Sequence, residues 1–203
     1  MHEGHRARVK ERFKQDGLDS FAPHEVLELL LFFAIPQRNV NPLAHALIEH
    51  FGSLAGVLEA SPEDLCNCAG VGDNAATLLS MVPQLSAYYA RNKFGPRPAL
   101  PNVAAAGAYC QTLFVGAVRE MLYLICLDTQ KRVIQPTLIQ KGTLDETPVY
   151  PRDVVAAALR SHAHAVVLAH NHPSGALLPS TSDYETTRMI ISALGAVQIP
   201  VLD

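Results

Sequence analysis

The chain has 203 residues, of which 49% are hydrophobic and 17% are charged, and its formal net charge is −3 at pH 7. The hydrophobic content excludes an intrinsically disordered chain, and the charge excludes a strongly basic nucleic-acid-binding protein. The charge is unevenly distributed, because residues 1–93 hold 8 Lys and Arg against 11 Asp and Glu, whereas residues 94–203 hold 8 of each. The length allows one domain or two small ones.

Targeting signals and metal-binding cysteine motifs are not expected. The first residues are not followed by a continuous apolar segment, so we expect no secretory signal. The most apolar stretch, residues 26–35, is too short for a membrane span of about 20 residues. We therefore expect a cytoplasmic protein with no membrane partner.

The cysteines lack zinc-binding spacing and are expected to be reduced core residues; they are Cys66, Cys68, Cys110 and Cys126.

The first half of the chain has helical patterning throughout. The segment 23–33 carries apolar residues around most of its circumference, which predicts a buried helix. Asn41, followed by proline, is typical of a helix start, and Gly52 is typical of that helix's end. Ser61, followed by proline and two acids, predicts another helix start. Residues 1–93 therefore form a helical domain.

A proline-rich segment and a change of pattern follow. Three prolines within six residues predict a stiff linker over residues 94–101. The pattern then alternates between helices and strands, which predicts a second domain, residues 102–203, with helices packed against a sheet. Its expected helices are 103–115, 151–161 and 181–194, and its expected strands are 121–127, 133–139, 165–169 and 199–203. The fold class is therefore α+β.

The second domain contains a candidate metal site at the end of a buried strand. His170 and His172 are two residues apart in an extended segment, so both imidazoles can point to one side. Asp183 follows Ser180 in the first turn of the next helix and can complete a three-ligand set of the catalytic zinc type. An alternative interpretation is that Ser180 and Asp183 form a capping box. The two interpretations are compatible.

A second histidine pair lies too far away to share this metal. His164 and His170 are six positions apart in an extended segment, which corresponds to roughly 20 Å. We therefore expect His162 and His164 to be surface residues between a helix and a strand.

Hydrolysis at such a site needs a carboxylate that accepts a proton from water. Glu120 directly precedes the core strand 121–127 and could face a cleft, but it could equally be a solvated acid at a strand end. The other candidates for this base are Asp128, Asp145, Glu146, Asp153 and Glu185.

These motifs resemble the JAMM (MPN+/JAB) metalloprotease superfamily, whose pattern is a glutamate followed by H-x-H-x7-S-x2-D. His170, His172, Ser180 and Asp183 match that spacing without a gap. The chain is more closely similar to the bacterial RadC family (UPF0758), through the segment His-Asn-His-Pro-Ser-Gly, the upstream Lys-Gly-Thr at 141–143, and the segments 1–6 and 28–36.

The resemblance implies an α/β/α JAB/MPN domain with a mixed sheet and a zinc site. It assigns His170, His172 and Asp183 as zinc ligands, Glu120 as the catalytic base and Ser180 as an oxyanion donor. RadC proteins usually continue past the last residue of this chain, so the C-terminal end of the domain is expected to be missing.

The resemblance also implies a helix-hairpin-helix region in the first domain, with Gly70 and Gly72 in its turn. The backbone N–H groups of such a turn can bind a DNA phosphate. The net charge of −3 in this half does not favour DNA binding, and the alternative is a compact helical module whose glycines only make the turn.

Taken together, the expected function is a RadC-type zinc-dependent hydrolase that cleaves an amide bond in an unidentified protein or peptide, with a nominal association with DNA repair. One alternative is a DNA-binding repair accessory protein whose metal is structural. Another is an assembly module with an inactive site.

Overall fold

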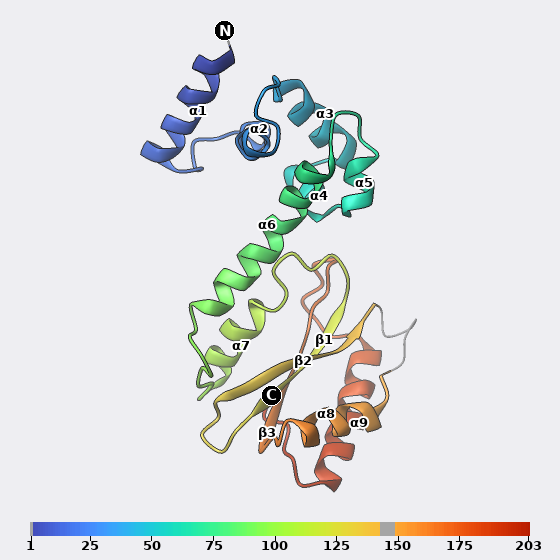
Figure 1. Cartoon of the computed structure of the whole chain (residues 1–203). Helices are drawn as coiled ribbons and strands as arrows, with labels where there is room; N and C mark the ends of the chain where they lie inside the picture. Colours follow the sequence, from blue (N-terminus) through green and yellow to red (C-terminus); the bar gives the residue numbers. More distant parts are fainter. Residues whose placement is uncertain (1, 143–148) are drawn as a thin grey trace. The chain divides into compact units, whose positions relative to one another are not determined.

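The computed structural model describes residues 2–142 and 149–203 (Figure 1). The chain divides into two compact units, Met1–Leu85 and Ser86–Asp203. Within residues 2–142 and 149–203, no helix has both the length and the apolar character that crossing a membrane requires.

The first unit is helical, and its helix starts follow the sequence signals closely. Ser61 caps the short helix α5 by accepting a hydrogen bond from the backbone nitrogen of Asp64 at 3.1 Å, and Gly52 ends α3 with a left-handed φ of 80°. Helix α3 begins at Asn41 itself, so Val40 and not Asn41 occupies the N-cap position. The helices of this unit are α1 (His2–Asp16), α2 (Pro23–Ala34), α3 (Asn41–Phe51), α4 (Leu54–Glu59), α5 (Pro62–Cys66) and α6 (Asp73–Asn92), whose last residues belong to the second unit.

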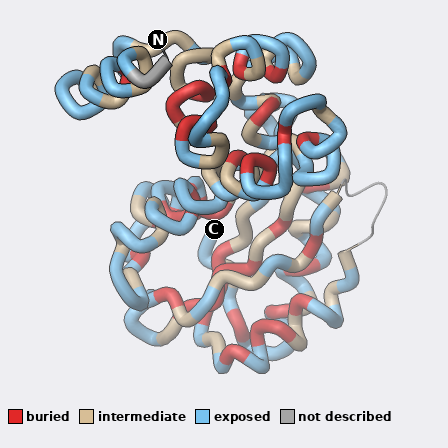
Figure 2. The backbone as a smooth tube through the Cα atoms, turned by 45° about the horizontal axis from the view of Figure 1, so that its top comes forward, coloured by how far each residue is buried: buried red, intermediate tan, exposed pale blue. Residues whose placement is uncertain are grey.

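Helix α2 forms the centre of the first unit and carries a buried charged group. Leu27 and Leu31 are fully buried, as the apolar pattern predicts. Glu28 is only 1% exposed, and its two carboxylate oxygens face His5 Nε2 at 3.1 Å and Asn41 Nδ2 at 3.3 Å. The buried acid therefore has a partner on α1 and another on α3. Figure 2 shows that most of α1 itself is exposed.

The second unit is a three-stranded sheet between two helical layers. The strands β1 (Met121–Leu127), β2 (Val133–Lys141) and β3 (Ala165–His170) are ordered β2-β1-β3, and both pairings are antiparallel. Side chains that alternate along β1 point to opposite faces. One face packs against α8 (Pro151–Arg160) and α9 (Thr181–Ala196), and the other packs against α7 (Val103–Gln111). The α/β/α arrangement and the α+β class are confirmed.

The mixed character of the sheet comes from the last residues of the chain. Val201 forms a parallel bridge with Val166 of β3, and the backbone nitrogen of Leu202 donates to the Val166 carbonyl at 2.8 Å. The segment 199–203 was expected to be a strand; the structure reduces it to this short parallel pairing. Helix α7 also ends at Gln111, four residues before its expected end.

The proline-rich segment 94–101 makes backbone contacts within the second unit. Ala99 forms an antiparallel bridge with Arg132, and the backbone nitrogen of Leu100 donates to the Lys131 carbonyl at 2.8 Å. Leu100 is 4% exposed and belongs to the apolar cluster on the α7 side of the sheet.

The cysteines are all free, but only two of them are core residues. Cys110 and Cys126 are buried, as expected, whereas Cys68 is half-buried and Cys66 is exposed. The expectation of four core cysteines was therefore wrong for Cys66, which lies on the last turn of the five-residue helix α5.

Candidate metal centre

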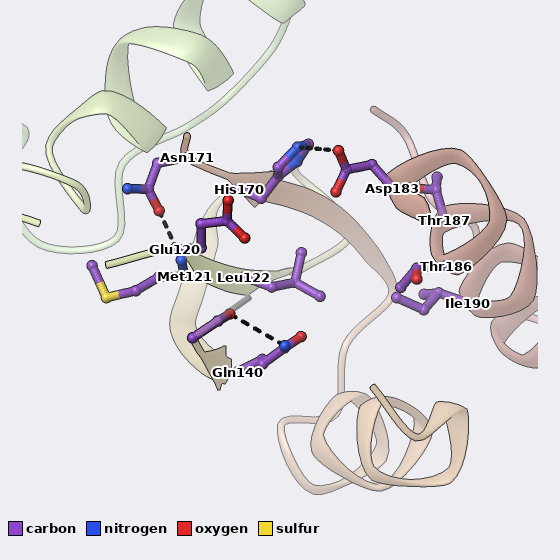
Figure 3. Close-up of a pocket in the computed structure, with 11 residues that line it drawn as sticks. Glu120, Met121, Leu122, Gln140, His170, Asn171, Asp183, Thr186, Thr187 and Ile190 are labelled. Atoms are coloured by element: carbon purple, nitrogen blue, oxygen red, sulfur yellow. Dashed lines mark hydrogen bonds and ion pairs between the residues drawn. The ribbon is translucent and has the colours of Figure 1, made fainter. Parts of the chain in front are cut away.

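Two histidines and an aspartate converge where β3 ends and α9 begins. His170 is the last residue of β3, and His172 follows it in the loop. Their Nε2 atoms are 3.1 Å apart, and Asp183 Oδ2 lies 3.5 Å from the first and 3.3 Å from the second. Among the described residues, this is the group of His, Cys, Asp and Glu side chains that could hold a metal ion. Figure 3 shows the His170–Asp183 contact from the side of the pocket.

The spacing of these three atoms fits a zinc ion. Zinc binds His nitrogen and carboxylate oxygen at about 2.0–2.1 Å with tetrahedral geometry, which places neighbouring ligand atoms about 3.3–3.4 Å apart. The three observed separations of 3.1, 3.3 and 3.5 Å lie around that value. The donors are also the imidazole and carboxylate groups that zinc accepts, and three protein ligands leave the fourth position open.

Asp183 is held in place by the start of its own helix. Its Oδ2 accepts hydrogen bonds from the Ser180 backbone nitrogen and from Ser180 Oγ, both at 2.7 Å, while Ser180 Oγ accepts from the Asp183 backbone nitrogen at 3.1 Å. The capping box anticipated as an alternative is therefore present, and it coexists with the convergence on the histidines. The carboxylate oxygen that caps α9 is the one that faces both imidazoles.

The charge state of Asp183 suits a metal ligand. Burial raises the pKa of this carboxyl, but the hydrogen bonds from Ser180 and the nearby His170 and His172 lower it, and the net effect is a pKa below the ordinary value. The group is therefore a carboxylate at neutral pH, which is the form that binds a cation.

The orientation of His172 is fixed by its other ring nitrogen. Nδ1 lies 3.0 Å from the carbonyl oxygen of Ala176, which can only accept a hydrogen bond. Nδ1 therefore carries the proton, and the lone pair of Nε2 faces His170 and Asp183. A backbone partner of this kind is typical of metal-binding histidines.

Glu120 lines the same small pocket as His170 and Asp183. It immediately precedes β1, and Figure 3 shows its side chain on the side of the pocket where His170 lies. The volume that the centre of a water molecule can reach in this pocket is about 30 Å³. A site needs about 10–15 Å³ by this measure to hold one water, so the pocket has room for water.

The other candidate bases lie elsewhere or outside the described residues. Asp128 accepts hydrogen bonds from Arg97 and from the backbone of its own turn. Asp153 and Glu185 are exposed, and none of these three lines the pocket. Two further candidates, Asp145 and Glu146, lie outside the described residues. His162 and His164 are exposed between α8 and β3, as predicted.

Four polar residues of the pocket were not anticipated from the sequence: Gln140, Asn171, Thr186 and Thr187. Thr186 and Thr187 lie three and four residues after Asp183, so they share its face of α9, and helical spacing from the aspartate could have identified them. Asn171 was missed although it lies between the two histidines, because its role depends on which residues of β1 face it.

The structure places Gly70 and Gly72 in the first unit, where Gly70 has a left-handed φ of 93°. This φ explains the need for glycine in the turn, and DNA contact there stays a prediction. Two cations of α1 have partners within the unit. Arg6 donates to the carbonyls of Phe32, Ile35 and Arg38, at and after the end of α2, and Arg12 pairs with Glu25 at 2.8 Å.

The second unit is an α/β/α domain with a group of side chains that could hold a metal ion where β3 ends and α9 begins. Residues 100–203 match the family model described as "RadC-like JAB domain", and residues 3–77 match the one described as "UPF0758 N-terminal". The chain therefore belongs to the RadC-like JAB family, which confirms the resemblance drawn from the histidine motif and from the N-terminal segments.

Proposed function

We propose that this protein is a zinc-dependent hydrolase of amide bonds, with His170, His172 and Asp183 as the zinc ligands. The observation that carries the proposal is the convergence of three donor atoms at tetrahedral spacing beside a pocket that Glu120 also lines. Membership of the JAB family supports the same class of chemistry.

A zinc ion held there supplies two effects, because it lowers the pKa of a water molecule and polarises the carbonyl of the substrate. Glu120 acts as the base: its carboxylate takes a proton from the water that attacks the carbonyl carbon. The same carboxyl then gives that proton to the leaving nitrogen as the carbon–nitrogen bond breaks, so that the products are a carboxylic acid and an amine.

Ser180 is the proposed donor to the oxygen that gains negative charge during the attack. Its hydroxyl donates to Asp183 Oδ2 at 2.7 Å in the structure, so it would have to exchange this partner for the substrate oxygen. Ser180 is exposed, which allows a substrate to reach it.

The pocket beside Glu120 has room for the water that acts as nucleophile.

The proposal is tested by metal analysis and by hydrolysis of a complex peptide mixture in H2¹⁸O. The purified chain should bind about one zinc, and the double variant His170→Ala/His172→Ala should bind none. With zinc bound, the wild type should generate new carboxyl groups that contain ¹⁸O, detected by mass spectrometry.

Glu120→Gln should keep the zinc and lower the rate by about 10²–10⁴-fold, because it cannot accept the proton. Glu185→Gln is the matched control, since Glu185 is an exposed acid on α9 that does not line the pocket. Full activity in Glu120→Gln would remove the base from the proposal. A zinc-loaded wild type that cleaves no peptide would contradict peptide hydrolysis and favour the alternative of a structural metal.

A further inference from the structure

We propose that Asn171 is a positioning residue that fixes Glu120 against the metal ligands, an inference that rests on the proposed function. Asn171 lies between His170 and His172 and is half-buried. Its Oδ1 accepts a hydrogen bond from the Met121 backbone nitrogen at 2.8 Å, and its Nδ2 donates to the Arg119 carbonyl at 3.2 Å. These two backbone groups are on either side of Glu120, and Figure 3 shows the bond to Met121.

The Asn171 side chain takes the place of a missing backbone pairing. In the antiparallel register of β1 and β3, Leu122 lies opposite His170, so Met121 would next lie opposite residue 171. The described pairing ends at His170, and the carboxamide of Asn171 supplies the acceptor and the donor that a continued strand would offer. The backbone is thereby free to turn and bring His172 back toward His170 and Asp183.

The backbone around Glu120 is consequently held by residues that follow each of the two neighbouring strands. On the β2 side, the backbone nitrogen of Gly142 donates to the Glu120 carbonyl at 2.8 Å. On the β3 side, the Asn171 carboxamide bonds to the Met121 backbone nitrogen and to the Arg119 carbonyl. Strand ends open more readily than strand centres, so a base placed just before β1 needs such contacts to stay in position.

Among side chains of this length, only asparagine can form both hydrogen bonds. Aspartate offers acceptors without a donor, serine is shorter, and alanine offers neither. A base displaced by about 1 Å can lose about 10²-fold in rate, although substrate binding is largely unaffected. Asn171 would then act on the rate through Glu120, without touching the substrate.

The test compares Asn171→Ala with Asn102→Ala in the full chain. Asn102 is a suitable control because its Oδ1 also accepts from a backbone nitrogen, that of Ala105 at 2.9 Å, where it caps α7. Backbone amide exchange is followed by NMR. In Asn171→Ala we expect exchange of the Met121 amide to rise at least about 10-fold, while the Leu100 amide, bonded to Lys131, keeps its protection. In Asn102→Ala, Met121 should keep wild-type protection.

The kinetic arm measures ¹⁸O-labelled peptide products with zinc bound. Asn171→Ala should keep one zinc per chain and lose about 10–100-fold in kcat, with KM within about 3-fold of the wild type. Asn102→Ala should keep wild-type kcat. If Asn171→Ala does not fold, Asn171→Asp replaces it. The Met121 amide should then stay protected because a carboxylate oxygen can still accept its hydrogen bond, while kcat falls because the Arg119 carbonyl loses its donor.

Unchanged Met121 exchange in Asn171→Ala, or wild-type kcat in either Asn171 variant, would overturn the inference. The exchange measurement does not depend on catalysis. If the wild type hydrolyses nothing, the proposed function fails, while the exchange of Met121 still decides whether Asn171 holds this segment.

Discussion

Asp183→Ala removes a carboxylate that helps to begin α9 and that we propose as a zinc ligand. A second helix start in the same chain allows these two roles to be separated. Ser61 and Asp64 begin α5 with the geometry of Ser180 and Asp183: in both pairs Ser Oγ lies 2.7 Å from the Asp Oδ2 and 3.1 Å from the Asp backbone nitrogen. Among the described residues, Asp183 but not Asp64 belongs to the group of side chains that could hold a metal ion. Asp64→Ala is therefore the matched control.

Without metal, both substitutions remove an acid from the first turn of a helix and the hydrogen-bond acceptor of its N-cap serine, which costs about 0.5–2 kcal/mol. Asp183→Ala should lie at the upper end, because the Ser180 backbone nitrogen also loses its acceptor and Asp183 is buried. A change of 1 kcal/mol shifts Tm by roughly 4 °C for a domain of this size. We expect the second unit of Asp183→Ala to melt roughly 4–8 °C below the wild type in EDTA.

Zinc should widen this difference. At a zinc concentration of 100 times Kd, binding stabilises the folded wild type by about 2.7 kcal/mol. Residues that merely support a ligand contribute about 10–100-fold in affinity, so removal of a ligand should cost at least about 100-fold. The same zinc concentration then equals Kd and stabilises Asp183→Ala by only about 0.4 kcal/mol. Asp64→Ala should keep the full zinc response.

Calorimetry with and without zinc, after removal of metal by EDTA, measures both effects on the three proteins. The expected pattern is a zinc-dependent rise in Tm for the wild type and Asp64→Ala, and almost none for Asp183→Ala. A full zinc response in Asp183→Ala would show that Asp183 is only a cap, and would remove it from the ligand set.

Two further predictions concern the packing of each unit. Arg6→Ala should lower the free energy of unfolding of the first unit by about 2 kcal/mol in urea denaturation, because three carbonyls at and after the end of α2 lose a charged donor. Arg8→Ala is the control, since it lies on the same helix and changes the charge equally, and it should cost less than about 0.5 kcal/mol. In the native protein at pH 8, the exposed Cys66 should react quickly with a thiol reagent, and the buried Cys110 should not. Burial raises the pKa of Cys110 to about 11, so its thiolate fraction stays small until the pH approaches that value. Rapid labelling of Cys110 at pH 8 would contradict that burial.

The sequence predicts best those features that depend on neighbours along the chain. The strand 121–127 and the starts of α8 and α9 were predicted at their observed residues, because turn and cap residues define them locally. The histidine pair and Asp183 could be predicted to converge because they flank a single loop. Asn171 and the buried Glu28 could not be predicted, since their partners lie about 50 and 23 residues away and are set by strand register and helix packing.

The cap on α9 also orients a proposed metal ligand before any metal ion binds. Ser180 restrains the Asp183 side chain through the same oxygen that faces the histidines, and the Ala176 carbonyl restrains His172. The rotamer entropy of these two ligands is thus lost when the polypeptide folds and not when a cation arrives. An ion that enters meets donors already in position, unlike in a zinc finger, where the peptide folds around its metal. Loading should therefore be limited by how fast the ion sheds its water, and chelation should leave the second unit folded.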